Sequence, residues 1–396
     1  MKYIKRAYVD ELVSVIGTPD IKVITGMRRA GKSVILEEFA DYVKSTDKKA
    51  NIIYINYSSV DFDNLRNYRA LNDFVESHYS PKMNNYLLID EIQMCEQFEL
   101  AINSLHSSSR YDIYITGSNA FLLSSDLATL FTGRAYPIEV YPFSFKEYLE
   151  YYPEKKDRYD AFDDYFADGG LAGSYRYSTT EQKRKYVENV YDTIVMRDIV
   201  EKHNVQNPQL LRRISEYLTD NISNLTTSRG IADALTSNQQ PTNNKTVGTY
   251  VDYLRNAFVF YPVRRYDVKG KAYLYSQEKY YLSDHSIKAA LLGVKDMDYG
   301  RVYENIVAIE LLRRGYEIYV GILRNKEIDF VAQKNGEKLY VQVSYDLTKN
   351  GVIERETTPL LSIQDAYPKI LIAKTRQPEY SHEGIRVIDI ADWLAE

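Results

Sequence analysis

The sequence has little of several features that would point to particular classes of protein. It contains one cysteine, Cys95, so no disulfide can form within the chain, which fits a reducing compartment. No apolar run approaches the ~20 residues of a membrane-spanning helix, and the first residues show no signal-peptide pattern. The five histidines have no metal-binding spacing. These absences predict a cytoplasmic protein that does not enter a membrane.

The charge of the chain excludes one further class. Lys and Arg number 50 against 55 Asp and Glu, which gives a formal net charge of −5. This balance provides no chain-wide basic field for nucleic acid, so any contact with DNA has to be local. The length of 396 residues is enough for two or three domains, each with a core of its own.

A phosphate-binding loop is the clearest positive feature. The pattern G-x-x-x-x-G-K-[ST] is met by Gly26-Met27-Arg28-Arg29-Ala30-Gly31-Lys32-Ser33, which Val34 follows. Apolar residues predict a buried strand before the loop, at 21–25, and an amphipathic helix after it. Backbone N–H groups of such a loop surround phosphate oxygens, Lys32 would reach the β- and γ-phosphates, and Ser33 would bind Mg²⁺. We therefore predict ATP binding; the alternative is an ordinary strand-to-helix turn beside a solvated lysine.

Two carboxylates follow a second apolar run. Residues 86–89 predict a parallel strand buried on both faces, and Asp90 and Glu91 stand at its carboxyl end, where such sheets bind ligands. There Asp90 would hold Mg²⁺, and Glu91 would polarise the attacking water. The alternative is a pair of surface carboxylates after a strand.

A third strand, at 112–116, precedes a polar turn that contains Asn119. The Asn119 side chain could hydrogen-bond the attacking water or the γ-phosphate. Equally, the turn could only begin the next helix, because Ser and Asn are good helix caps.

These segments resemble a known family. "VITGMRRAGKS", "YLLIDEIQ" and "YITGSNAFLLSSDLATLFTGRAYPIEVYPFSFKEYL" are similar to AAA+ type ATPases of bacteria and archaea that carry a C-terminal domain of unknown function. The resemblance covers nearly the whole chain, and it implies Walker A, Walker B and sensor 1 motifs, with the sensor 1 strand between the other two. It also makes Arg134 a candidate arginine finger or nucleotide sensor; a structural arginine in an ion pair is the alternative.

The expected fold class is α/β: a P-loop parallel sheet with helices on both faces, a helical and winged-helix segment, and a C-terminal nuclease-like domain. We place the ATPase domain at 1–142, a helical lid or connector at 143–208, a winged-helix-like domain at 209–282 and the nuclease-like domain at 283–396. Three short helices and a hairpin predict the winged helix. Its third helix carries few arginines that could read bases, so contact with DNA and contact with a protein or another domain both stay open.

The last segment resembles the PD-(D/E)xK nuclease fold. Asp329 matches the acidic position of that fold, and Glu304 or Glu310 could be its helix carboxylate. However, Gln342-Val343-Ser344 stands where Glu-x-Lys is needed, which weakens a divalent metal site, and nothing favours Lys338 as a migrated lysine. We therefore expect a nuclease-like domain without nuclease activity.

Together these features favour a Mg²⁺-dependent ATPase whose nucleotide state repositions the winged helix and the C-terminal domain. The first alternative is a nucleotide-gated regulator that binds DNA or a protein with little turnover. The second is a metal-dependent DNA nuclease. The oligomeric state stays open, because an arginine finger that acts in trans would need a neighbouring subunit.

Overall fold

The computed structural model describes residues 4–118, 131, 133–237, 241–295 and 297–396. The chain divides into two compact units. The first consists of Met1–Val140 with Asn256–Phe258, and the second of Tyr141–Arg255 with Val259–Glu396. Within the described ranges, no helix combines the length and the apolar character needed to cross a membrane.

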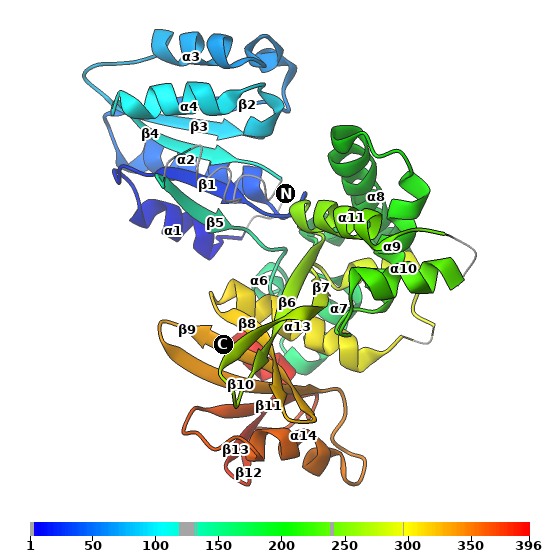
Figure 1. Cartoon of the computed structure of the whole chain (residues 1–396). Helices are drawn as coiled ribbons and strands as arrows, with labels where there is room; N and C mark the ends of the chain where they lie inside the picture. Colours follow the sequence, from blue (N-terminus) through cyan, green and yellow to red (C-terminus); the bar gives the residue numbers. More distant parts are fainter. Residues whose placement is uncertain (1–3, 119–130, 132, 238–240, 296) are drawn as a thin grey trace. The chain divides into compact units, whose positions relative to one another are not determined.

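The first unit is built on a parallel sheet with the strand order β2-β3-β4-β1-β5 (Figure 1). Its strands are β1 (Ile21–Thr25), β2 (Ala50–Asn56), β3 (Asn84–Asp90), β4 (Tyr111–Thr116) and β5 (Ala135–Glu139). Neighbouring strands all pair in parallel. β4 lies between β1 and β3, as the family resemblance implied. The carboxyl ends of β1, β3 and β4 therefore meet at one edge of the sheet.

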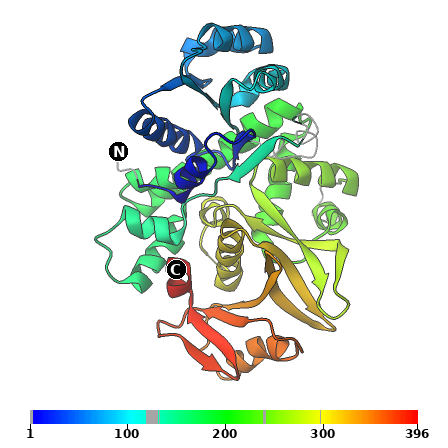
Figure 2. The same ribbon diagram turned by 90° about the vertical axis from the view of Figure 1, so that its left-hand side faces the viewer.

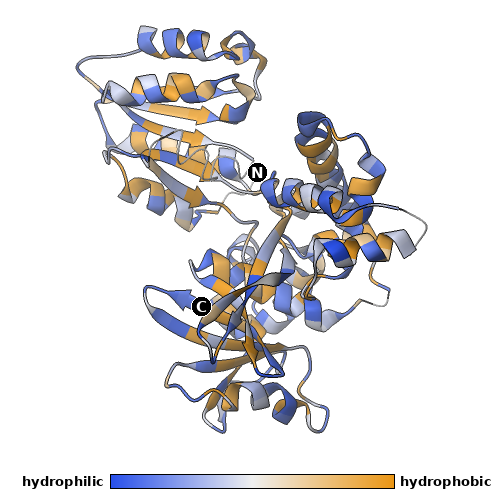
Figure 3. Ribbon diagram, in the orientation of Figure 1, coloured by the Kyte–Doolittle hydropathy of each residue, from blue (hydrophilic) through white to orange (hydrophobic). Residues whose placement is uncertain are grey.

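Helices cover both faces of this sheet. They are α1 (Ala7–Ser14), α2 (Lys32–Thr46), α3 (Tyr68–Ser77) and α4 (Phe98–Ser107), with the short 3-10 helices η1 (Val60–Leu65) and η2 (Ile92–Met94). Ile113 and Ile115 share a core with α3 and α4, whereas Tyr114 between them shares a core with α1 and α2. Because both faces are covered, apolar residues predominate in the strands (Figure 3).

The second unit begins with a helical segment. Its helices are α6 (Phe145–Tyr151), α7 (Arg158–Asp168), η4 (Ala172–Arg176), α8 (Thr180–Thr193), the π-helix η5 (Ile194–Glu201), α9 (Pro208–Asp220), α10 (Ser228–Ser237) and α11 (Asn244–Asn256). Ser144 begins α6 through a capping box with Glu147, in which each side chain accepts the other residue's backbone N–H. The helices α9, α10 and α11 are the three helices that the sequence predicted for this segment, and their assignment to a winged helix stays a prediction.

The hairpin after α11 belongs to a larger mixed sheet with the strand order β12-β13-β11-β10-β9-β8-β6-β7. Its strands are β6 (Phe260–Asp267), β7 (Ala272–Leu282), β8 (Glu317–Leu323), β9 (Lys326–Lys334), β10 (Glu337–Ser344), β11 (Lys369–Ala373), β12 (Tyr380–His382) and β13 (Ile385–Asp389). The helices that accompany it are α12 (Ser286–Leu292), α13 (Tyr299–Arg313), α14 (Val352–Leu361) and α15 (Ile390–Ala395).

One pairing in this sheet differs from the expected domain division. β6 pairs in parallel with β8, with Arg265 opposite Val320. The hairpin that was expected to be a separate wing therefore shares one hydrogen-bonded sheet with residues 283–396, from its yellow-green strands to the red C-terminal ones (Figure 2). The expected boundary between 282 and 283 does not separate two compact units, because parallel pairing joins strands that are far apart in the sequence.

Candidate nucleotide-binding site

The predicted phosphate-binding loop lies between β1 and α2. Gly26 has a φ of +137° and Gly31 a φ of +102°, values that L side chains rarely adopt. A Cβ on Gly26 would lie 2.1 Å from the carbonyl oxygen of Val140, so only glycine fits there. Gly31 directly precedes the first turn of α2, whose unpaired N–H groups carry partial positive charge. The loop thus provides both the tight turn and the helix end that bind a phosphate.

The side chains of the loop divide into buried and exposed ones. Met27 and Ala30 are buried, Arg28 and Val34 are half-buried, and Arg29 is exposed. Lys32 is 4% exposed, and its Nζ donates to the carbonyl oxygens of Gly26, at 2.8 Å, and Met27, at 3.0 Å. The ammonium group therefore lies inside the curve of the loop, where it can neutralise a phosphate.

Asp90 links the loop to β3. It is 1% exposed, and its carboxylate accepts hydrogen bonds from the Ser33 side chain and from Thr116 Oγ1, the latter at 2.5 Å. Burial raises the pKa of Asp90, although the hydrogen bonds from Thr116 and Ser33 and the charge of Lys32 act in the opposite direction. The structure thus brings together the two residues expected to bind Mg²⁺, with Lys32 beside them.

Glu91 is held by polar neighbours at the same edge. Its φ of +57° lies in the left-handed region, which costs a non-glycine residue on the order of 1 kcal/mol. Its N–H donates to Thr116 Oγ1 at 3.0 Å. One carboxylate oxygen accepts from Gln93 Nε2, and also from Ser118 Oγ at 3.4 Å. These bonds orient a carboxylate that is not part of an ion pair with the loop.

Four residues of this edge were not singled out from the sequence: Thr116, Ser118, Gln93 and Glu37. Thr116 ends β4, and Gln93 lies two residues after Glu91, so strand ends and near neighbours of the motif were the available signals. Glu37 stands one helical turn after Ser33 on α2. Burial and the nearby Asp90 and Asp41 raise the pKa of Glu37, which shows that a further carboxylate lies near the Asp90 site.

Of the remaining two candidates, the structure describes only Arg134. Asn119 lies outside the described residues, and its assignment stays a prediction. Arg134 immediately precedes β5, and its carbonyl oxygen accepts from the N–H of Ile21, the first residue of β1, at 2.8 Å. Because β1 and β5 run parallel, Arg134 lies at the amino edge of the sheet, about 15 Å from the loop by strand rise. Its side chain is exposed and begins far from the loop, and its role as an arginine finger or nucleotide sensor stays a prediction.

Arg6 supports the loop from a segment that the sequence patterns did not mark. It is 4% exposed, and its Nη1 donates to the carbonyl oxygen of Ala30 at 2.7 Å. The Ala30 C=O and the Gly31 N–H belong to one trans peptide group and point in opposite directions. Arg6 holds the Ala30 carbonyl pointing toward its guanidinium, so the Gly31 N–H points away from Arg6. Arg6 therefore fixes the orientation of one donor of the loop.

We expect Arg6→Ala to weaken binding of MgATP by about 5–30-fold, because a charged hydrogen bond that orients the loop is worth about 1–2 kcal/mol. Calorimetric titration with MgATP measures the change. Lys5→Ala is the matched control, since Lys5 pairs with Asp10 at the surface, where both side chains are exposed. An Arg6→Ala protein with wild-type affinity and an unchanged melting temperature would show that Arg6 does not shape the loop.

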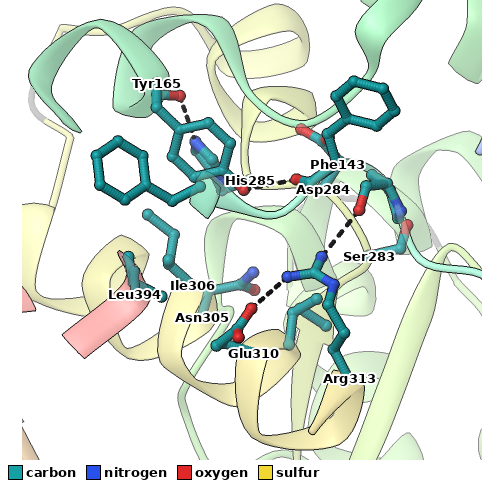
Figure 4. A pocket seen from close by; sticks show the side chains of 13 residues that line it. Phe143, Tyr165, Ser283, Asp284, His285, Asn305, Ile306, Glu310, Arg313 and Leu394 are labelled. Carbon is teal, nitrogen blue, oxygen red and sulfur yellow. Dashed lines mark hydrogen bonds and ion pairs between the residues drawn. The ribbon is translucent and has the colours of Figure 1, made fainter. Parts of the chain in front are cut away.

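The residues expected from the nuclease resemblance are only partly brought together. Glu304 of α13 lies near Asp329 of β9, because the charge of Glu304 raises the pKa of Asp329. Glu310, the other candidate on this helix, instead forms ion pairs with Arg313 and with Arg314 Nε, the latter at 2.8 Å. It lines a separate small pocket beside His285 (Figure 4).

The two remaining residues of that resemblance do not supply a metal site. Lys338 lies over the ring of Tyr266, with its Nζ 5.0 Å from the ring centre, and also over Tyr340 and Tyr367. Gln342 Oε1 accepts from the backbone N–H of Asp329 at 3.3 Å. As the side chains stand in the part of the chain that the structure describes, no three His, Cys, Asp or Glu residues are grouped so as to hold a metal ion.

Family models match two parts of the chain. An AAA domain matches residues 18–149, and a domain of unknown function, DUF8612, matches residues 159–298. A Haemophilus influenzae protein named "Uncharacterized protein" is 38% identical over 396 residues, which is 98% of this chain and 98% of that protein. "Uncharacterized protein MJ1544" of Methanocaldococcus jannaschii is 28% identical over 94% of this chain and 85% of its own.

Solved structures show more distant likeness. The Walker-type ATPase PABY2304 of Pyrococcus abyssi has a TM-score of 0.46 at 14% identity, over 73% of this chain and 96% of its own. AMPPCP-bound DnaA from Aquifex aeolicus has a TM-score of 0.33 at 17% identity, over 63% of this chain and 86% of its own.

The parallel sheet, the glycine loop and the acidic strand end all lie within residues 18–149, the part of the chain that the AAA domain model matches. As a whole, the chain belongs to the same family as the Haemophilus influenzae protein.

Proposed function

We propose that this protein binds ATP with Mg²⁺ at the carboxyl edge of the first sheet and hydrolyses it. The main support for the proposal is that the side chains of Ser33, Asp90 and Lys32 lie close together. The side chain of Ser33 hydrogen-bonds the buried Asp90 carboxylate, and the charge of Lys32 acts on the same carboxylate. A hydroxyl and a carboxylate suit Mg²⁺, and an ammonium group beside them suits phosphate.

The residues at this edge fit a bound triphosphate and its metal. Gly26 and Gly31 both have positive φ, and an added Cβ on Gly26 would clash with the backbone of Val140, so the tight curve of the loop depends on glycine. Thr25, the last residue of β1, has a buried hydroxyl with no hydrogen-bond partner among the described residues. A buried unsatisfied hydroxyl requires an explanation, and a ligand or water at the base of the loop provides one.

Each residue has a distinct task in the proposed reaction. Lys32 and the N–H groups of the loop bind the phosphates, and Ser33 and Asp90 would hold Mg²⁺. When bound, Mg²⁺ neutralises charge on the phosphate oxygens. Glu91 orients the attacking water and accepts its proton. Gln93 and Ser118 position the Glu91 carboxylate through their hydrogen bonds to it.

The nucleotide state would be passed to the second unit through the chain itself. Val140, the last residue of the first unit's main segment, donates its N–H to the carbonyl of Thr25 at 2.7 Å and lies against Gly26. Two and three residues later, Pro142 O accepts from Arg313 Nη2 at 2.8 Å, and Phe143 N donates to Gly170 O at 2.7 Å. A shift of the loop at Gly26 would therefore act on backbone that is firmly bonded within the second unit.

For the helices α9 to α11, we propose contact with a protein partner rather than with DNA. The exposed charged residues of α11 are Lys245 and Asp252, and Arg255 of the same helix pairs with Asp252 at 3.0 Å. The three charged side chains of this helix sum to +1, and one of its two cations is paired within the helix, so it has little to bind phosphate or to read bases.

The proposed function is tested with MgATP by calorimetry and by phosphate release. We expect the wild-type protein to bind and hydrolyse MgATP, and Lys32→Ala to lose at least about 100-fold in affinity, because a buried charge contact with phosphate is removed. Lys44→Ala, at an exposed lysine on the same helix, is the matched control and should behave as wild type. A folded wild-type protein that takes up no MgATP would overturn the proposal.

A further inference from the structure

A buried lysine in the second unit lies among three carboxylates. Lys279 of β7 is 2% exposed. Its Nζ is 2.8 Å from Glu304 Oε1, 2.7 Å from Glu327 Oε1 and 4.0 Å from Asp329 Oδ1. Glu304 comes from α13, and the other two carboxylates come from β9. The ammonium group therefore occupies the point at which these three acidic side chains converge.

The carboxylates around Lys279 are anchored by further donors. Glu304 Oε1 also accepts from Tyr281 Oη at 2.7 Å, and Asp329 Oδ2 accepts from the backbone N–H of Val343 at 2.8 Å. Tyr281 thus donates to the same Glu304 oxygen that faces the ammonium group, and Val343 donates to the other oxygen of the Asp329 carboxylate. The cluster is thus an ordered site for one cation, and that cation is part of the chain.

The three surrounding carboxylates stabilise the positive charge of Lys279. Burial lowers the pKa of Lys279, but Glu304, Asp329 and Glu327 outweigh burial and raise the pKa above its ordinary value. The lysine is therefore charged at every physiological pH. Burial in turn raises the pKa of Glu304 and Asp329, so these carboxylates depend on a nearby positive charge.

We propose that the Lys279 ammonium takes the place of a divalent metal ion in this nuclease-like arrangement, so that the second unit neither binds such a metal there nor cuts nucleic acid. Mg²⁺ and Mn²⁺ need oxygens at about 2.0–2.2 Å around a centre that is free of other cations. Here that centre is filled by a buried ammonium, which would also repel a divalent ion.

The neighbouring Gln342 is also unsuited to bind a divalent metal ion. Gln342 stands where a nuclease of this type has a carboxylate, and both ends of its amide are engaged. Its Oε1 accepts from the N–H of Asp329, and its Nε2 donates to Glu356 Oε2 at 3.1 Å. Gln342 therefore stabilises the backbone of β9 and offers no charge to a metal. This inference is independent of ATP binding in the first unit.

The test removes the internal cation and supplies an external one. In Lys279→Ala, three carboxylates lose their ammonium, so we expect a lower melting temperature and a new capacity to bind Mn²⁺. With Mn²⁺ at about ten times its dissociation constant, the melting temperature of the variant should rise by about 3–5 °C, while that of the wild type stays unchanged. Lys279→Gln, a milder change, serves if the alanine variant does not fold. Mn²⁺ alone is the probe, without nucleotide.

Two controls make the result specific. Lys288→Ala also removes a buried lysine, but its Nζ donates to the backbone carbonyls of Thr219, at 2.9 Å, and Asp220, at 3.0 Å. It also pairs with the exposed carboxylate of Asp220, at 3.6 Å, and one exposed carboxylate is a poor site for Mn²⁺, so Mn²⁺ should not restore the stability of this variant. Adding Asp329→Asn to Lys279→Ala should abolish the gain of Mn²⁺ binding. The proposal is wrong if the wild type binds Mn²⁺ at a site that Asp329→Asn removes, or if it nicks supercoiled plasmid in an Asp329-dependent way. It is equally wrong if neither folded Lys279 variant gains Mn²⁺ binding.

Discussion

Glu91→Gln is expected to lower kcat for ATP hydrolysis by about 10²–10⁴-fold and to change the affinity for MgATP by no more than about threefold. The amide has the shape of the carboxylate, and its oxygen can still accept from Gln93 and Ser118. It cannot accept a proton from water, so the loss falls on the chemical step. Phosphate release at saturating MgATP measures the rate, and calorimetry measures the affinity.

Glu96→Gln is the matched control for this change. Glu96 is exposed and lies five residues further along the chain, so we expect its glutamine variant to hydrolyse ATP at the wild-type rate. Wild-type kcat in Glu91→Gln would show that another group activates the water. If instead the wild type binds MgATP with no measurable turnover, the protein is a nucleotide-gated regulator, the alternative class.

The residues of the nucleotide site differ in how far the sequence could predict them. Gly26, Lys32 and Ser33 stand in one continuous pattern, and Asp90 ends an apolar run, so local spacing is enough to place them. Arg6 could not be found in this way, because its role depends on the distance of its guanidinium from the Ala30 carbonyl. No local pattern encodes such a contact between a segment before the first helix and a loop 24 residues later.

The position of Arg134 depends on the direction in which the strand after it runs. A Gly-Arg pair shortly before a strand is the signal for Arg134, but the sequence does not tell at which edge of the sheet that strand begins. The parallel pairing of β5 with β1 places Arg134 at the edge opposite the loop. The AAA-like parallel sheet itself was predictable, because strands buried on both faces are apolar throughout.

The second unit was less predictable, since its sheet joins strands from distant parts of the chain. The hairpin of β6 and β7 is visible as two apolar runs around a turn, yet only the parallel pairing of β6 with β8 shows which sheet it belongs to. For the same reason Lys279 could not be connected with Glu304 and Asp329. A lysine within a strand is usually read as a solvated residue, and only its burial among carboxylates shows otherwise.

Gly26→Ala is expected to destabilise the first unit by at least about 3 kcal/mol and to abolish ATP binding. The added Cβ would lie 2.1 Å from the carbonyl oxygen and 3.0 Å from the carbonyl carbon of Val140. Backbone atoms cannot rotate away as a flexible side chain can. The hydrogen bond of 2.7 Å from Val140 N to Thr25 O ties the two segments together, so relief of the clash requires β1 and β5 to separate.

Gly17→Ala is the matched control, because Gly17 also has a positive φ, +74°, but has nothing within 4 Å of an added Cβ. It should cost only the left-handed penalty, about 1 kcal/mol. The single tryptophan, Trp393, lies in the second unit, so its fluorescence follows that unit while far-ultraviolet circular dichroism follows both. In Gly26→Ala, the melting temperature of one transition followed by circular dichroism should therefore fall. The melting temperature followed by tryptophan fluorescence should stay unchanged. Equal losses in the two glycine variants would mean that backbone strain, and not the contact with Val140, requires glycine at position 26.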